Sequence, residues 1–195
     1  MASDLKAKTV SGMVWSAFDK FGVKLISFLS NIILARMLTP DDYGCIGMLM
    51  IFILISMTFV DGGFASALIQ KKSPTKDDEC TVFYWNLAVS LICYCALFFS
   101  AKSIANFYNI PKLEQVLKVQ GIILFTNSLQ IIQFNKLRRE LRFKDLTKIN
   151  ITSAGLATVL AITAAFLGFG VWALVIQQLA QSVFNGIFAW ITCKW

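Results

Sequence analysis

The chain has 195 residues, of which 57% are hydrophobic, and its formal net charge is +7. Soluble domains contain about 45 to 50% apolar residues, so this composition, with a mean hydropathy of +0.67, indicates an integral membrane protein. The basic residues lie at the ends of apolar stretches, as membrane topology and anionic lipid headgroups require. We therefore expect membrane lipids, and no nucleic acid, as partners.

Several stretches of the sequence are long and apolar enough to cross a bilayer. A hydrocarbon core about 30 Å thick requires about 20 mostly apolar residues per helix. The candidate spans cover residues 12–38, 44–62, 80–101, 114–134, 149–167 and 171–192. They predict an all-α fold, a six-helix transmembrane bundle that forms a single domain over residues 1–195.

The first span carries polar residues along one side. Ser16, Lys20, Lys24, Ser27 and Asn31 are three or four positions apart, so they share one helix face. A lysine at the centre of a membrane helix costs about 2.5 to 3.5 kcal/mol. Lys20, Lys24, Ser27 and Asn31 are therefore candidates to face water, a partner or an anionic ligand. Alternatively, the residues before Lys20 lie flat on the membrane and Lys24 extends back to the headgroups.

The second and third spans begin with helix-capping sequences. Thr39 is followed three positions later by Asp42, and Thr75 is followed by three acids. Such pairs satisfy the free N–H groups of a first turn, so we interpret these acids as caps rather than catalytic residues. Asp61, expected at the outer end of the second span, is a candidate ion-pair partner for Lys24 or a coupling-ion ligand. The alternative for Asp61 is a solvated carboxylate at a helix end.

The fourth and sixth spans carry rows of amide side chains. The rows are Gln120, Asn127 and Gln130, and Gln177, Gln181 and Asn185. Each residue alone is explained by an ordinary hydrogen bond between helices, but several of them in one bundle favour a hydrated interior.

The segment between the fourth and fifth spans, residues 135–148, contains six basic residues among apolar ones. It fits either a short amphipathic helix on the inner leaflet or simple retention of positive charge inside the cell. Residues 168–170 are expected to form a tight hairpin on the outer side.

The distribution of charge between the loops predicts the orientation. One side of the membrane holds only Arg36, Lys102, Lys112 and Lys118, whereas twelve basic residues lie on the other side. Because positive loops stay in the cytoplasm, both termini are expected inside the cell. Lys20 and Lys24 interrupt the first span and no small-residue cleavage site follows it, so we expect it to remain as an anchor.

Cysteine and histidine content argues against an enzyme. The sequence has no histidine, and its five cysteines show no C-x-x-C spacing. Zinc-hydrolase sites and Ser-His-Asp catalysis therefore lack the histidine that they require. We expect no catalytic residue, no metal ion and no cofactor.

Five segments, in this order, resemble a known family. They are residues 34–44, residues 61–64 with 67–70, Phe107-Tyr108 with Pro111, residues 137–143 and residues 170–174. All are similar to bacterial polysaccharide-export flippases of the multidrug/oligosaccharidyl-lipid/polysaccharide transporter superfamily. The resemblance covers almost the whole chain.

The resemblance implies a transporter that moves a polyprenyl-diphosphate-linked oligosaccharide across the bacterial inner membrane by alternating access. A cationic cavity containing Lys20 and Lys24 would compensate the diphosphate charge. Family members usually have two six-helix lobes, so the chain corresponds to the N-terminal lobe and lacks the C-terminal one. A second lobe or a homo-oligomer is then the expected partner. The alternatives are half of a multidrug exporter, or a truncated remnant or assembly partner that does not transport.

Overall fold

The computed structural model describes residues 2–63, 67–68 and 75–193, the side chains of residues 2–11 and 13 excepted. Phe64, Ile69 and Gln70, which carry part of the family resemblance, lie outside these residues. The helices are α1 (Ala2–Ala35), α2 (Pro40–Asp61), α4 (Lys76–Tyr108), α5 (Lys112–Gln120), α6 (Ile123–Arg139), α7 (Phe143–Phe166) and α8 (Val171–Thr192). The described residues form no strand, so the predicted all-α fold is confirmed.

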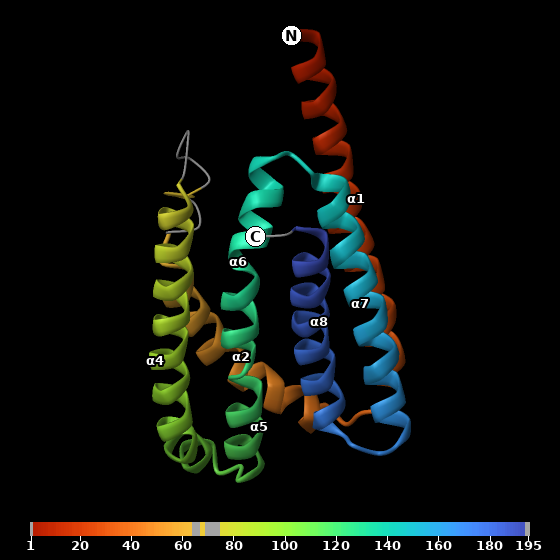
Figure 1. The fold of residues 1–195 in the computed structure, drawn as a ribbon. Coiled ribbons are helices and arrows are strands. Elements are labelled where there is room, and N and C mark those ends of the chain that lie inside the picture. Colours follow the sequence, from red (N-terminus) through yellow and green to blue (C-terminus); the bar gives the residue numbers. More distant parts are fainter. Residues whose placement is uncertain (1, 64–66, 69–74, 194–195) are drawn as a thin grey trace.

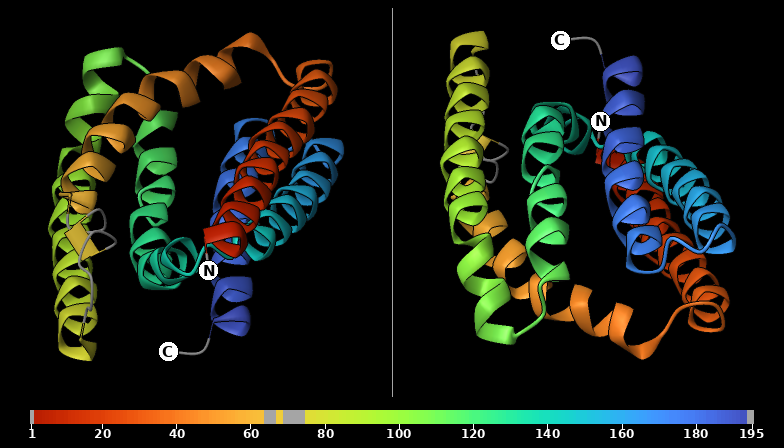
Figure 2. Two further views of the ribbon diagram at one scale, coloured as in Figure 1. Left: turned by 90° about the horizontal axis from the view of Figure 1, so that it is seen from above. Right: turned by 90° about the horizontal axis from the view of Figure 1, so that it is seen from below.

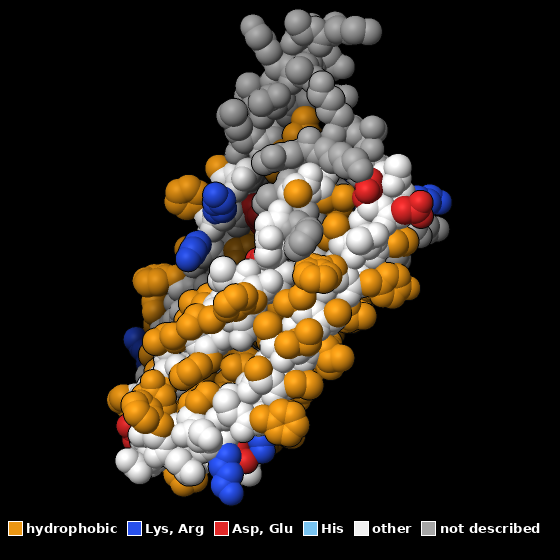
Figure 3. All heavy atoms as spheres, turned by 90° about the vertical axis from the view of Figure 1, so that its left-hand side faces the viewer, with side chains coloured by type: hydrophobic (Ala, Val, Ile, Leu, Met, Phe, Trp, Pro, Cys, Tyr) orange, Lys and Arg blue, Asp and Glu red, His pale blue; other side chains and the backbone are white. Residues whose placement is uncertain are grey.

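Four helices within the described part of the chain, α2, α4, α7 and α8, are long and apolar enough to cross a membrane. The chain is therefore a multi-pass membrane protein. Figure 3 shows hydrophobic side chains covering the face around α4, with the visible charged side chains mostly toward the two ends. Helix α1 is also long, but it carries Asp19, Lys20 and Lys24 in its middle.

The fourth predicted span is divided into α5 and α6. Between them, Ile122 N–H donates to the Val119 carbonyl at 3.2 Å and Leu124 N–H donates to that of Gly121 at 3.1 Å, so the chain tightens locally into 3₁₀-type bonding. A Cβ atom at Gly121 would lie 3.0 Å from the ring of Tyr94 on α4. Glycine at this position therefore lets an aromatic ring pack directly against the backbone at the break.

The bundle has two distinct ends. The basic end contains the start of α1, the end of α2, the turn between α6 and α7 and the end of α8, at the top of Figure 1. The opposite end contains residues 36–39, 109–111 and 167–170. These two names are used below without implying which end faces the cytoplasm.

The helices pack in a continuous series. Helix α1 packs against α7, α7 against α8, α8 against α6, α6 against α4, and α4 against α2. Residues 36–39 join the end of α1 to the start of α2, and from there the two helices separate toward the basic end, as both views in Figure 2 show. Helices α1 and α2 are thus the two ends of this packing series, although they are consecutive in the sequence.

Both predicted capping boxes are present. At α2, Thr39 Oγ1 accepts from Asp42 N–H at 3.4 Å, and Thr39 N–H donates to Asp42 Oδ2 at 3.2 Å. At α4, Thr75 and Asp78 make the reciprocal pair at 3.3 and 2.8 Å. The acids at these positions are therefore structural caps, as the sequence indicated.

The prediction of a separate amphipathic helix within residues 135–148 is wrong. Helix α6 continues to Arg139, a turn follows in which Leu141 has φ 56°, and α7 begins at Phe143. The segment forms the end of α6, the turn and the start of α7. Its basic residues therefore lie at the basic end of the bundle. The alternative, retention of positive charge inside the cell, stays a prediction.

The apolar core is concentrated in the half nearer the opposite end. A large cluster there includes the fully buried Leu34, Leu49, Leu113, Leu117 and Val171. A second, smaller cluster of Leu137, Leu146, Ile149, Ala189 and Cys193 lies at the basic end, between α6, α7 and α8. Between these clusters the interior is lined by polar side chains.

Candidate functional site

A cavity of about 380 Å³ lies between α2, α6 and α8 and extends toward the basic end. Its described lining residues are Asp61, Gly63, Asn127, Gln130, Ile131, Phe134, Asn135, Arg138 and Asn185. A smaller space of about 140 Å³ adjoins it and shares Asp61, Asn127 and Ile131. We call the larger space the polar cavity.

Part of the cavity wall is a hydrogen-bonded network. Asn127 Oδ1 accepts from Gln130 Nε2 at 2.8 Å and from Ser182 Oγ on α8 at 2.7 Å. Ser182 Oγ and Thr126 Oγ1 are 2.6 Å apart. The amide row predicted on the fourth span therefore joins α6 to α8.

The other predicted amides have divided roles. Gln120 Nε2 donates to Gln178 Oε1 at 2.8 Å, and Gln177 Nε2 donates to Ser30 Oγ on α1 at 2.8 Å. These pairs are ordinary hydrogen bonds between helices, nearer the opposite end. Asn127, Gln130 and Asn185, in contrast, line the polar cavity. The interpretation as hydrogen bonds between helices is therefore confirmed for Gln120 and Gln177, whereas the hydrated interior stays a prediction.

Asp61 was expected at the same end of the bundle as residues 168–170, but it lies at the other end. The second span returns from the side that holds residues 36–39, so its last residue lies with the positive loops at the basic end. Arg138 is close enough to Asp61 for an electrostatic interaction, and both line the polar cavity. Arg138, on α6, is therefore the cation that the structure brings to Asp61.

Lys20 and Lys24 are exposed on α1. The face of α1 that packs on α7 is marked by its contacts: Asn150 Nδ2 donates to Asp19 Oδ1 at 3.0 Å, and Thr147 Oγ1 donates to the Trp15 carbonyl at 3.0 Å. Each residue turns a helix by about 100°. Lys20 therefore lies beside this packed face rather than in it, and Lys24 follows one turn later.

The other two candidates on α1 lie near the opposite end. Ser27 is half-buried and Asn31 is exposed, and the carbonyl of Asn31 accepts from Tyr43 Oη on α2 at 3.4 Å. The nearby residue that the structure does bury is Ser30, which Gln177 contacts. It stays a prediction that the four candidates contact the substrate: Lys20, Lys24, Ser27 and Asn31.

The sequence analysis did not single out the remaining cavity residues, which are Gly63, Ile131, Phe134, Asn135 and Arg138. Asn127, Ile131, Phe134 and Arg138 follow a spacing of four, three and four, so they share one face of α6. Extending the predicted amide row by two turns would have found this face. The row was missed because the segment beyond residue 134 was assigned to a separate surface helix.

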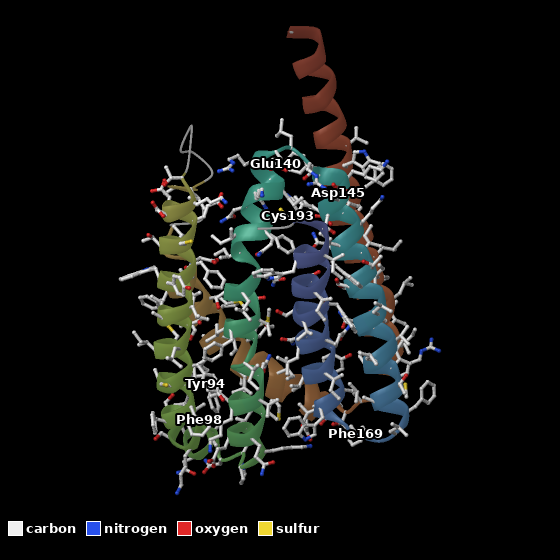
Figure 4. All side chains as sticks on the ribbon, in the orientation of Figure 1. Tyr94, Phe98, Glu140, Asp145, Phe169 and Cys193 are labelled. Atoms are coloured by element: carbon white, nitrogen blue, oxygen red, sulfur yellow. The ribbon has the colours of Figure 1, made fainter. Side chains whose placement is uncertain are left out.

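Charged groups at the basic end are largely engaged with one another. Arg139 Nη2 lies 3.5 Å from Glu79 Oε1, which connects α6 to the start of α4. Arg142 Nη2 lies 2.7 Å from Asp145 Oδ2, and this hydrogen-bonded contact raises the pKa of the guanidinium above its ordinary value. Figure 4 places Glu140, Asp145 and Cys193 at this end and Tyr94, Phe98 and Phe169 toward the other.

The sequence model of the polysaccharide biosynthesis protein family matches residues 33–195. The chain belongs to this family. The resemblance to polysaccharide-export proteins is thereby confirmed.

Proteins named for polysaccharide biosynthesis or transport are similar to most of the chain. The succinoglycan biosynthesis transport protein ExoT of Rhizobium meliloti is 27% identical over 192 residues, 97% of this chain and 39% of its own length. The teichuronic acid biosynthesis protein TuaB of Bacillus subtilis is 25% identical, covering 93% and 38%. The lipopolysaccharide biosynthesis protein WzxC of Escherichia coli is 27% identical, covering 83% and 33%.

The chain spans about two fifths or less of the length of each of these relatives. No solved structure matches it.

Three segments that carry the family resemblance meet at the opposite end of the bundle. Asp42 at the start of α2 lies 3.7 Å from Lys112 Nζ, next to Pro111. The Val171 N–H also bonds to the Asp42 carboxylate. A Cβ atom at Gly170, which has φ 55°, would lie 3.3 Å from Asp42 Oδ1. In this polysaccharide biosynthesis protein, Asp42 therefore joins the starts of α2, α5 and α8.

Proposed function

We propose that the protein takes part in polysaccharide export by moving a polyprenyl-diphosphate-linked oligosaccharide across the bacterial inner membrane. In this proposal both termini lie in the cytoplasm, so the basic end faces inward. The bundle is one lobe, and alternating access requires a second lobe or a second copy of the chain. The roles for which the three relatives are named support the choice of a polysaccharide substrate.

The observation that carries this proposal is the exposure of Lys20 and Lys24 outside the α1–α7 contact. A lysine in a membrane helix is costly unless it meets water or an anion. The lysines are one helical turn apart, so their ammonium groups can approach a single anionic group. A diphosphate crossing hydrocarbon needs such compensating positive charge, and its lipid tail can stay in the bilayer.

The test replaces both lysines in cells whose polysaccharide export depends on this protein. We expect Lys20→Ala/Lys24→Ala to abolish export of the lipid-linked glycan while membrane insertion stays normal. The double Lys→Arg variant should retain export because the charge is kept.

The matched control is Lys144→Ala/Lys148→Ala, which removes two exposed lysines at the same spacing on α7. It should leave export close to normal. Unchanged export in the Lys20/Lys24 variant, or equal loss in both double variants, would remove the α1 pair from the mechanism.

A further inference from the structure

The polar cavity contains buried polar atoms that have no partner. Gln130 is 8% exposed and Asn135 is 3% exposed, and both line the cavity. Gln130 Oε1, Asn135 Nδ2 and Asn185 Oδ1 are buried without a hydrogen bond. Buried polar side chains are paired in the large majority of cases. Atoms of Asn86, Gln120 and Ser153 are also unpartnered in the described bundle, but only these three are on residues that line the polar cavity, where they offer hydrogen-bonding positions to water or to a polar ligand.

The charges in the wall constrain the ligand. Asp61 contributes one negative charge and Arg138 contributes one positive charge, and the two interact. Since they offset each other, the wall as a whole attracts neither a cation nor an anion strongly. The unpartnered atoms include an amide donor on Asn135 and amide acceptors on Gln130 and Asn185. A fitting ligand is neutral and offers both donors and acceptors.

We propose that the polar cavity binds a neutral sugar unit. Each sugar hydroxyl can donate and accept a hydrogen bond, as the two kinds of unpartnered amide atom require. Phe134 supplies an apolar ring against which the C–H face of a sugar can pack. The volume of about 380 Å³ is within the range of small-molecule pockets. This inference rests on the proposed function, since the sugar would belong to the transported glycan.

The test measures sugar binding to the whole 195-residue chain in lipid nanodiscs. Glucose, galactose and N-acetylglucosamine are added one at a time, and saturation transfer from protein to sugar protons is recorded by NMR. The test variants are Gln130→Leu and Asn185→Leu, which remove one acceptor each from the cavity. The matched control is Gln120→Leu, which removes a buried glutamine whose partner, Gln178, lies outside the cavity lining.

We expect at least one of the sugars to give a signal with the wild-type chain and with Gln120→Leu. The signal should fall at least about fivefold in Gln130→Leu and in Asn185→Leu, while circular dichroism shows unchanged helix content in all variants. Absence of a signal for every sugar, or equal signals in the test and control variants, overturns the proposal.

A cation site is the competing outcome. If replacing choline chloride with sodium chloride raises the unfolding temperature of the wild type but not of Asp61→Asn, the cavity is a cation site and the proposal fails. The export test of Lys20 and Lys24 is independent of these results. Failed sugar binding with lysine-dependent export would reject the cavity assignment alone, whereas sugar binding with lysine-independent export would reject only the lysine mechanism.

Discussion

The two ends of the bundle are built on different principles. At the opposite end, leucines and small residues pack into a continuous apolar core, and Asp42 connects three helix starts. At the basic end, α1 and α2 have separated, the apolar cluster is small, and amides with Asp61 and Arg138 surround a cavity. The comparison teaches that one end holds the helices together, whereas the other leaves room and unused hydrogen-bonding capacity for a ligand.

The largest effect is expected when a buried leucine side chain is removed, because this leaves a new cavity in the apolar core near the opposite end. Leu117 is 0% exposed, so Leu117→Ala should lower the free energy of unfolding by about 2 to 5 kcal/mol. Leu167→Ala is the matched control, because Leu167 is 70% exposed. Thermal unfolding in detergent, followed by circular dichroism, measures both. Similar losses in the two variants would mean that this end is not the packed one.

The next largest loss of stability is expected where Asp42 joins the starts of α2, α5 and α8. Gly170→Ala places a Cβ atom against the Asp42 carboxylate at a positive φ, and should cost about 1 to 3 kcal/mol. Gly168→Ala also has a positive φ, but no heavy atom lies within 4 Å of its Cβ position, so it isolates backbone strain from the contact. Chemical unfolding of both variants gives the difference. If Gly168→Ala costs as much as Gly170→Ala, the contact with Asp42 contributes nothing.

Access of water to the two ends can be compared by labelling single cysteines. In a background with all native cysteines changed to alanine, Asn185→Cys at the polar cavity should react with a charged maleimide at least about tenfold faster than Val175→Cys. Val175 lies on the same helix but is 1% exposed within the apolar core. Equal labelling rates would remove the distinction between a hydrated half and a packed half.

The smallest effect is expected for the ion pair between α4 and α6. Arg139 is partly exposed, so Glu79→Gln should change the free energy of unfolding by about 0.2 to 1 kcal/mol, less at high salt. Unfolding at low and high sodium chloride measures this dependence. A loss as large as that of Leu117→Ala would show that charge, not apolar packing, dominates helix association.

Much of the fold was predictable because its signals are local. The length of the apolar runs predicted the membrane helices. Two helix starts were predicted from the pairs Thr39 with Asp42 and Thr75 with Asp78. The division of the fourth span was not predictable in the same way. At the break, Gly121 meets the ring of Tyr94, which is a contact between residues distant in sequence.

The site was predictable in part. Asn127, Gln130 and Asn185 follow from amide spacing on single helices, and all three line the polar cavity. The proximity of Asp61 to Arg138 depends on how α2 and α6 lie in space, and the sequence instead suggested Lys24. Asp61 was also expected at the wrong end of its span. Successive spans run in opposite directions, so the last residue of the second span returns to the basic end.

The separation of α1 and α2 has a consequence for how the helices are tied together. The two helices diverge from residues 36–39, and α1 packs on α7 whereas α2 packs on α4. The short connection at residues 36–39 therefore links two helices that are each held by a different neighbour.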